Sequence, residues 1–73
     1  MAEKNHYHFI GVCGTAMGAV AAAMKERGIT VTGSDERIYP PMSTFLEESG
    51  VEIVEGYRAS NIPESADVII IGR

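Results

Sequence analysis

The sequence predicts an α/β protein with a parallel sheet of four strands, and three observations support this prediction. Four short apolar runs are separated by two helical segments and a final connection that contains proline. The last run, "DVIII" (67–71), is apolar at consecutive rather than alternate positions, which is typical of a parallel strand buried on both faces. An alanine-rich segment follows the first run closely. These features predict the order β-α-β-α-β-turn-β.

The first helix is predicted by "TAMGAVAAAMKERG" (15–28), which is rich in alanine and other good helix formers. Lys25 and Arg27 place cations at the negative end of this helix, and Gly28 suits the position just after it. The four apolar runs predict strands at residues 7–11, 29–33, 51–54 and 68–71.

The second helix is predicted by "PPMSTFLEESG" (40–50), a shorter segment that ends at Gly50. Two starting points are open. Pro41 suits the first helical position, because its missing N–H has no partner there in any helix. Alternatively, Thr44 and Glu47 form a capping box and the helix begins later.

The last connection, "EGYRASNIPESA" (55–66), is long enough for a parallel crossover, but Pro63 limits any helix in it to about one turn. With right-handed crossovers, the elements form a Rossmann-like, doubly wound sheet in the order 3-2-1-4, and a flavodoxin-like order is the alternative. The chain stops soon after the fourth strand, so residues 1–73 are expected to be one domain truncated after strand 4.

Composition excludes several classes of function. Ten acidic residues against six basic ones, with no basic cluster, argue against nucleic acid or an anionic membrane as a partner. No apolar run approaches the ~20 residues of a membrane span, and the N-terminus lacks the apolar core of a signal peptide. A single cysteine fits the cytoplasm. His6 and His8 have no Cys, Asp or Glu at ligand spacing, so no metal site is expected.

The stretch "HFIGVCGTAMG" (8–18) predicts a phosphate-binding loop. Ligands of open α/β sheets bind at the carboxyl ends of the strands, and this loop runs from the first strand into a helix N-terminus. No Lys or Arg lies between Lys4 and Lys25, so backbone amides are expected to bind the phosphate. Thr15 adds a hydroxyl, either as the helix N-cap or as a ligand donor.

The loop departs from the dinucleotide fingerprint G-x-G-x-x-G/A. Gly11 and Ala16 match its first and third positions, but Cys13 occupies the second, where a side chain obstructs the usual NAD pose. Gly14 therefore suggests a shifted loop for a different diphosphate. Asp35, after the second apolar run, is placed to accept hydrogen bonds from a ribose hydroxyl or a base N–H, and it would repel a 2′-phosphate.

Four segments resemble a known family: "HFIGVCGTAMG", "VTGSDERIYPPMSTFLEESGVEI", "GY" (56–57) and "ADVIIIG" are similar to the N-terminal domain of the Mur ligases. Within that family, "CGT" followed by "MG", and above all "YPPMST", resemble the murein peptide ligase branch. The UDP-N-acetylmuramate–L-alanine ligase branch is similar in outline, but its loop usually reads G-x-G-G-x-G-M. Whether the parent enzyme adds a peptide or L-alanine is left open.

The resemblance implies a domain that binds the UDP part of a UDP-N-acetylmuramyl substrate in a three-domain ligase. The uridine end of the substrate is expected at Ser34 and Asp35. The residues expected to face the diphosphate are Gly11, Cys13, Gly14, Thr15, Ala16, Met17 and Gly18.

The parent enzymes of this family are ATP- and Mg²⁺-dependent and activate a carboxylate as an acyl phosphate, which an amine then attacks. This sequence lacks the P-loop lysine that ATP binding requires, so the fragment is expected to have no catalytic residue, cofactor or metal of its own. Its expected partners are the UDP-N-acetylmuramyl substrate and the central and C-terminal domains of the same protein.

Two other functions are open. The same layout suits an NAD- or nucleotide-sensing regulatory Rossmann module, although Cys13 counts against it, and it also suits a folded fragment without useful affinity. Purely structural roles compete with binding roles: the glycines for turns and packing, Asp35 as a turn cap, and Cys13 and Met17 as packing residues. Tyr39 either directs the chain into the second helix or lies exposed near the uridine pocket.

Overall fold

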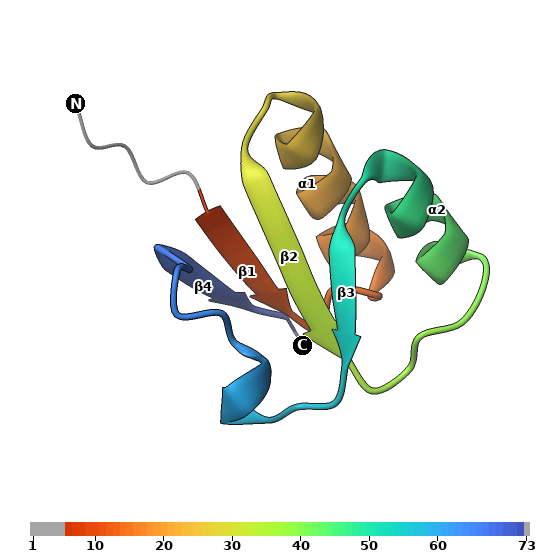
Figure 1. Ribbon diagram of the computed structural model, residues 1–73. Helices are drawn as coiled ribbons and strands as arrows, with labels where there is room; N and C mark the ends of the chain where they lie inside the picture. The colour runs from red at the N-terminus through yellow and green to blue at the C-terminus, as the bar shows by residue number, and fades with distance from the viewer. Residues whose placement is uncertain (1–5, 73) are drawn as a thin grey trace.

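The computed structural model describes residues 6–72. A four-stranded sheet is packed against two helices, and a short 3₁₀ helix, η1, precedes the last strand (Figure 1). None of the helices in these residues is long and apolar enough to cross a membrane. The elements in chain order are β1 (His6–Ile10), α1 (Thr15–Glu26), β2 (Thr30–Asp35), α2 (Met42–Ser49), β3 (Glu52–Glu55), η1 (Ala59–Asn61) and β4 (Val68–Ile71).

The sheet has the order β3-β2-β1-β4 with every neighbouring pair parallel, which confirms the predicted order and excludes the flavodoxin-like alternative. In the register, Phe9 pairs with Gly33 and Ile70, and Asp35 pairs with Glu55. The carboxyl ends of β1 and β2 therefore lie together at one edge of the sheet, where the glycine loop (residues 11–18) begins.

The helix ends differ in detail from the predictions. Gly28 follows α1 with φ of +88°, as expected of the residue after a helix. Gly14 rather than Thr15 occupies the N-cap position of α1, so the prediction of Thr15 as N-cap is wrong. The predicted capping box of Thr44 is also wrong, because α2 begins at Met42, just after Pro41, and leaves Thr44 inside the helix. The expected single turn before Pro63 is η1.

Both long helices cover the same face of the sheet, and the core lies between them and the strands. Phe9, Val12, Ala21 and Leu46 are fully buried there, each with no exposed surface. Successive right-handed crossovers in one direction place their helices on one face, so α1 and α2 pack side by side (Figure 1).

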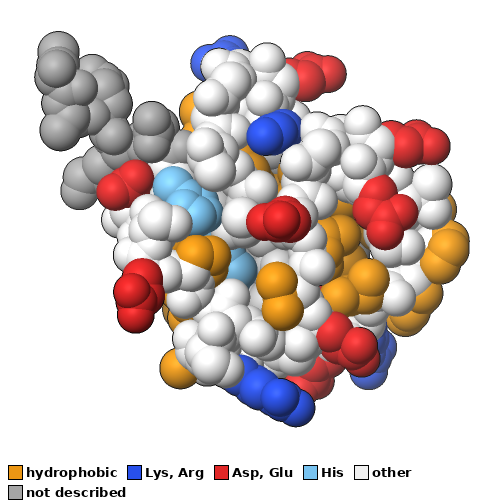
Figure 2. All heavy atoms as spheres, viewed as in Figure 1, with side chains coloured by type: hydrophobic (Ala, Val, Ile, Leu, Met, Phe, Trp, Pro, Cys, Tyr) orange, Lys and Arg blue, Asp and Glu red, His pale blue; other side chains and the backbone are white. Residues whose placement is uncertain are grey.

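The opposite face of the sheet is covered less than the sequence predicts. Ile69 and Ile71 are 46% and 68% exposed, so β4 is not buried on both faces as its run of apolar residues suggested. The reason is topological: the connection from β3 to β4 returns across this face and contains only η1. On the face shown in Figure 2, acidic side chains are scattered and basic ones do not gather into a patch.

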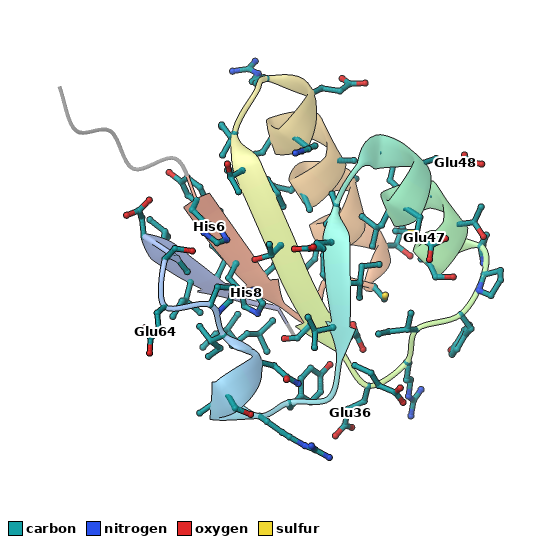
Figure 3. The ribbon with its side chains drawn as sticks, viewed as in Figure 1. His6, His8, Glu36, Glu47, Glu48 and Glu64 are labelled. Atoms are coloured by element: carbon teal, nitrogen blue, oxygen red, sulfur yellow. The ribbon has the colours of Figure 1, made fainter. Side chains whose placement is uncertain are left out.

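Hydrogen-bonded polar side chains occupy the centre of this second face. His6 and His8 project from β1 on the same side (Figure 3). The Thr32 hydroxyl lies 3.0 Å from His6 Nε2 and 2.8 Å from His8 Nδ1, and the Ser34 hydroxyl lies 3.3 Å from His8 Nε2. Burial, and then repulsion from His6, lower the pKa of His8. Within residues 6–72, His, Cys, Asp and Glu side chains form no group of three that could hold a metal ion.

Candidate functional site

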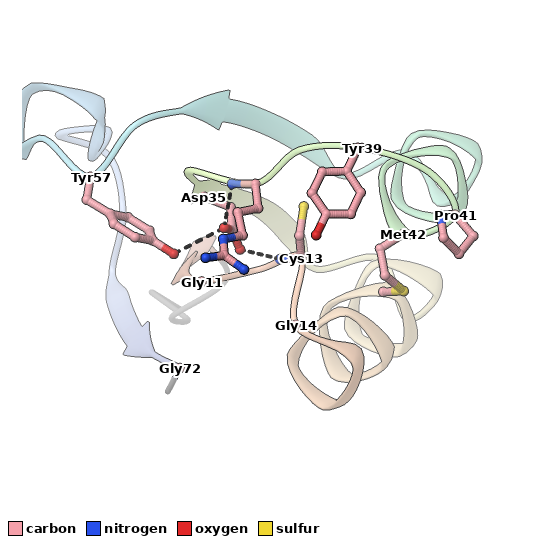
Figure 4. Close-up of a pocket in the computed structure, with 10 residues that line it drawn as sticks. Gly11, Cys13, Gly14, Asp35, Tyr39, Pro41, Met42, Tyr57 and Gly72 are labelled. Atoms are coloured by element: carbon pink, nitrogen blue, oxygen red, sulfur yellow. Dashed lines mark hydrogen bonds between the residues drawn. The ribbon is translucent and has the colours of Figure 1, made fainter.

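A cavity of about 390 Å³ opens at the carboxyl edge of the sheet, where the segments that follow all four strands meet (Figure 4). In an open α/β sheet this edge, at the point where the winding reverses between β1 and β4, is the usual place for a ligand. The lining residues are Gly11, Cys13, Gly14, Asp35, Arg37, Tyr39, Pro41, Met42, Tyr57 and Gly72.

The glycine loop uses most of its own amides internally. The N–H groups of Gly11 and Val12 both donate to the Ser34 carbonyl, at 2.8 and 3.2 Å, and the N–H of Gly14 donates to the Gly11 carbonyl at 3.1 Å. Gly11 adopts φ of +90°, a left-handed conformation that favours glycine, at the turn out of β1. The bare backbone of this loop therefore serves first to make a tight turn bound to β2.

The amides that stay available belong to the first turn of α1. Intrahelical hydrogen bonding begins when Gly18 N donates to Gly14 O at 2.7 Å, so the N–H groups of Thr15, Ala16 and Met17 have no acceptor within the helix. The positive end of the helix dipole lies at the same place. An anion at the N-terminus of α1, next to Gly14 in the cavity wall, would meet these three donors and no lysine.

Asp35 is the most highly connected side chain of the site. It is 6% exposed, and its Oδ2 accepts from the Cys13 amide at 2.9 Å. Its Oδ1 accepts from the Arg37 amide at 3.0 Å and from the Tyr57 hydroxyl at 3.1 Å (Figure 4). Burial raises the pKa of this carboxyl, but hydrogen bonds from the Arg37, Cys13, Tyr57 and Glu36 donors outweigh burial and lower it overall.

This carboxylate connects three segments that are far apart in the sequence: the glycine loop, the turn after β2 and the loop after β3. The hydrogen bond from the Arg37 amide, two residues after Asp35, is the interaction expected if Asp35 caps a turn. Both oxygens are committed to groups of the protein. The geometry thus favours Asp35 as a residue that holds the walls of the cavity in place, and its contact with a uridine stays a prediction.

The structure divides the predicted site residues into two groups. Gly11, Cys13, Gly14 and Asp35 line the cavity, and Ser34 does not. Ser34 lies one residue before Asp35 in β2, so its side chain points to the opposite face of the sheet, where it contacts His8 and lines a separate cavity of about 280 Å³.

Residues 15–18 of the glycine loop form the first turn of α1, and the packing of this helix determines where their side chains point. Thr15 and Ala16 are exposed at the start of α1, and their side chains do not line the cavity. Met17 is partly buried against the core, which agrees with the prediction that it is a packing residue. Gly18 faces α2, where an added side chain would collide with Met42. Of these four residues, Thr15, Ala16 and Met17 can offer backbone amides to an anion, whereas the Gly18 amide is committed to the Gly14 carbonyl.

Arg37 and Tyr57 line the cavity but were missed by reasoning along the sequence. No Lys or Arg lies in the glycine loop itself, whereas Arg37 comes from the turn after β2. The predicted strand order could have indicated both residues, because the residues that follow parallel strands lie at the same edge of the sheet. Tyr39, weighed as either a turn residue or a pocket residue, lines the cavity and is exposed.

Cys13 is partly buried at the cavity wall. Burial, and then the negative charge of Asp35, raise the pKa of its thiol. The thiolate is the nucleophilic form, so this environment suppresses reactivity. The Cys13 amide donates to Asp35, and the Cys13 side chain packs against the core. Both observations agree with the prediction that Cys13 is a packing residue.

A parallel sheet with a glycine loop entering a helix, and a cavity at the reversal of winding, defines a Rossmann-like α/β domain. Comparison with known families identifies the chain further. Residues 6–73 match the model described as "Mur ligase family, catalytic domain", and the chain belongs to this family.

The similar proteins are peptidoglycan ligases. The chain is 51% identical over 67 residues to a UDP-N-acetylmuramate–L-alanyl-γ-D-glutamyl-meso-2,6-diaminoheptandioate ligase of Haemophilus influenzae, covering 92% of the chain and 15% of the relative. A murein peptide ligase structure from Psychrobacter arcticus matches with a TM-score of 0.87 and 49% identity, covering 92% of the chain and 14% of that structure. A UDP-N-acetylmuramate–L-alanine ligase of Syntrophomonas wolfei is 36% identical, covering 86% of the chain and 13% of the relative.

The chain thus spans about 15% of the length of the relatives it matches, and it corresponds to their N-terminal domain. The order of identities agrees with the resemblance seen in "YPPMST", with the murein peptide ligases above the L-alanine ligases. The comparisons lend no support to an NAD- or nucleotide-sensing module.

Proposed function

We propose that this chain binds the UDP part of a UDP-N-acetylmuramyl substrate, as the N-terminal domain of an amide-bond ligase in peptidoglycan synthesis or recycling. The observation that carries this proposal is the convergence of the glycine loop, up to Gly14 at the N-cap of α1, and Arg37 on one cavity at the carboxyl edge of the sheet. As a domain with a single cysteine that binds a nucleotide sugar, it is proposed to act in the cytoplasm.

The diphosphate is assigned to the end of the cavity at α1. The free amides of Thr15, Ala16 and Met17 and the helix dipole favour an anion there. Arg37 adds a full positive charge, and its guanidinium forms charge-assisted hydrogen bonds to phosphate oxygens. Asp35 repels the anion less than an unpaired carboxylate would, because donors of the protein surround its charge.

The nucleoside is assigned to the part of the cavity beside Tyr57, which lies across Asp35 from Gly14 and Tyr39 (Figure 4). The Tyr57 side chain is 50% exposed, so its ring offers apolar surface to a planar base. The cavity volume of about 390 Å³ lies at the small end of the range for small-molecule sites, roughly 300–1,000 Å³. The muramyl part of the substrate would extend out of this cavity.

The ATP and Mg²⁺ chemistry of the whole enzyme is assigned to parts of the protein outside this chain. The glycine loop lacks the lysine of an ATP-binding P-loop, and the described residues form no carboxylate or histidine cluster for a metal. Whether the whole protein joins a peptide or L-alanine is likewise decided elsewhere, and the higher identity to peptide ligases favours the peptide.

The proposal is tested by titrating the ¹⁵N-labelled chain with UDP-N-acetylmuramic acid, with NAD in parallel, and following the amide resonances. We expect the UDP sugar to shift the amides of Thr15, Ala16 and Met17. Arg37→Ala should weaken binding by about 10-fold or more, because a hydrogen bond to a charged group contributes about 1.5–3 kcal/mol. Arg27→Ala, at the opposite end of α1, is the matched control and should leave the dissociation constant unchanged.

Two results would contradict the proposal. Shifts caused by NAD alone would indicate a dinucleotide-sensing module. If millimolar UDP sugar does not shift the amide resonances of Thr15, Ala16 and Met17, the domain has the fold of a binding domain without measurable affinity.

A further inference from the structure

Tyr57 occupies a special position among the residues of the cavity. It lies in the loop after β3 and lines both the candidate site and the separate cavity that Ser34 lines. Its side chain is 50% exposed, yet its hydroxyl points inward to Asp35 (Figure 4). The phenol oxygen is therefore at the wall of the candidate site, accessible to a ligand.

The backbone around Tyr57 is held without help from its own side chain. The Gly56 amide donates to the Asp35 carbonyl at 2.9 Å. The Asn61 side-chain amide donates to the carbonyls of Glu55 and Gly56, both at 2.9 Å. Since the loop is anchored at these points, removal of the Tyr57 hydroxyl should leave the position of the ring largely unchanged.

The direction of the hydrogen bond between Tyr57 and Asp35 is determined by chemistry. An ionised carboxylate only accepts hydrogen bonds, so the phenol must donate its single proton to Asp35. The lowered pKa of Asp35 keeps that group ionised, and the pKa of Tyr57, raised by burial and by this bond, keeps the phenol protonated. A ligand at the Tyr57 oxygen therefore meets lone pairs and no proton, and the Glu36 amide also approaches this oxygen.

The two ends of the cavity thus have opposite hydrogen-bonding character. The free amides of the first turn of α1 only donate, whereas the Tyr57 oxygen, on the other side of Asp35 (Figure 4), only accepts. Oxygens of a diphosphate, which only accept, match the first end and are disfavoured at the second. Ribose hydroxyls and base N–H groups carry the protons that the second end lacks.

We propose that Tyr57 is a specificity-determining residue, which accepts a hydrogen bond from a hydroxyl or N–H group of the nucleoside and so sets the orientation of the nucleotide in the cavity. This inference rests on the proposed function, because it assumes that a nucleoside diphosphate occupies the site. It assigns Tyr57 a direct ligand contact and Asp35 the role of the positioning residue that takes the phenol proton.

The test compares UDP with inorganic pyrophosphate, which has the diphosphate but no nucleoside, in amide titrations of the 73-residue chain. Tyr57→Phe should raise the dissociation constant for UDP roughly 2- to 12-fold, the range for one neutral hydrogen bond. The same variant should bind pyrophosphate within about 2-fold of the wild-type chain. Tyr7→Phe, on the helix-covered face of β1, is the matched control and should change neither constant.

Other outcomes would overturn the inference in distinct ways. Unchanged UDP binding by Tyr57→Phe would remove Tyr57 from the ligand contacts while leaving the proposed function intact. Equal weakening for both ligands would show that Tyr57 acts through Asp35 on the glycine loop, and a shifted Cys13 amide in the free variant would report the same. If the wild-type chain binds UDP no more tightly than pyrophosphate, the proposed function is overturned together with this inference.

Discussion

Replacement of Asp35 by alanine should be among the most damaging single changes at the site. The carboxylate is almost fully buried and accepts hydrogen bonds from the Cys13 amide, the Arg37 amide and the Tyr57 hydroxyl. The alanine variant leaves all three donors without this acceptor. Water reaches the half-exposed Tyr57 easily, so the two backbone amides dominate the loss.

The magnitude follows from these two amides. A hydrogen bond to a charged group contributes about 1.5–3 kcal/mol, and partial rehydration of the amides reduces what is lost. We therefore expect Asp35→Ala to lower the free energy of unfolding by about 2–4 kcal/mol. A chain of this size has roughly 4–11 kcal/mol in total, at about 0.05–0.15 kcal/mol per residue, so the loss is a large fraction.

Urea unfolding at pH 7, followed by far-UV circular dichroism, measures this difference. Asp35→Asn keeps one acceptor oxygen and the shape of the side chain, so it should lose about half as much. Glu36→Ala removes the exposed neighbouring carboxylate and serves as the matched control, with an expected change within about 0.5 kcal/mol. If the free energy of unfolding of Asp35→Ala also lies within about 0.5 kcal/mol of the wild-type value, the carboxylate does not hold the cavity walls together.

The pH dependence gives a second check on Asp35. Its pKa in the folded chain is lower than in the unfolded chain, so it contributes stability above the unfolded value, near about 4. This contribution is lost as the pH falls through the folded-state pKa. The wild-type chain should therefore lose stability below about pH 4 more steeply than Asp35→Ala. Parallel acid profiles for the two proteins would contradict the assignment.

Two further predictions concern the sheet. Gly33→Ala should destabilise the chain by about 1–3 kcal/mol, because its Cβ would lie 2.6 Å from Val12 Cβ, whereas Gly14→Ala, whose nearest contact is at 3.4 Å, should change thermal stability little. Equal melting temperatures for these variants would refute that packing argument. The pKa of His8 is lowered, so the wild-type chain should lose stability as the pH falls from about 7 to 5, and His8→Gln should lose less. Identical slopes in melting temperature would exclude His8 as the cause.

Most of the secondary structure and its order followed from the sequence, because local patterns carry that information. Consecutive apolar residues in "DVIII" and the alanine-rich "TAMGAVAAAMKERG" indicated β4 and α1 without reference to the rest of the chain. The right-handedness of crossovers then left few sheet orders, and the correct one was among them. The resemblance in "YPPMST" pointed to the same family that the comparisons identify.

Strand boundaries show where local reasoning fails. The second strand was predicted to end at Gly33 but continues to Asp35, which places Ser34 inside it. Side chains alternate along a strand, so Ser34 and Asp35 point to opposite faces and cannot serve the same pocket. Apolar pattern alone could not show this, because the last residues of β2 are a glycine, a serine and an aspartate.

The sequence by itself determined the fold class, the family and the position of the glycine loop, since each depends on residues that are neighbours in the chain. Only the tertiary structure decided which groups form the cavity. Arg37 and Tyr57 reach it from the segments after β2 and β3, and Asp35 engages the Cys13 amide across a long separation in sequence. Such contacts depend on strand register and on which face the helices cover, and both are set by packing of the whole sheet rather than by any local stretch.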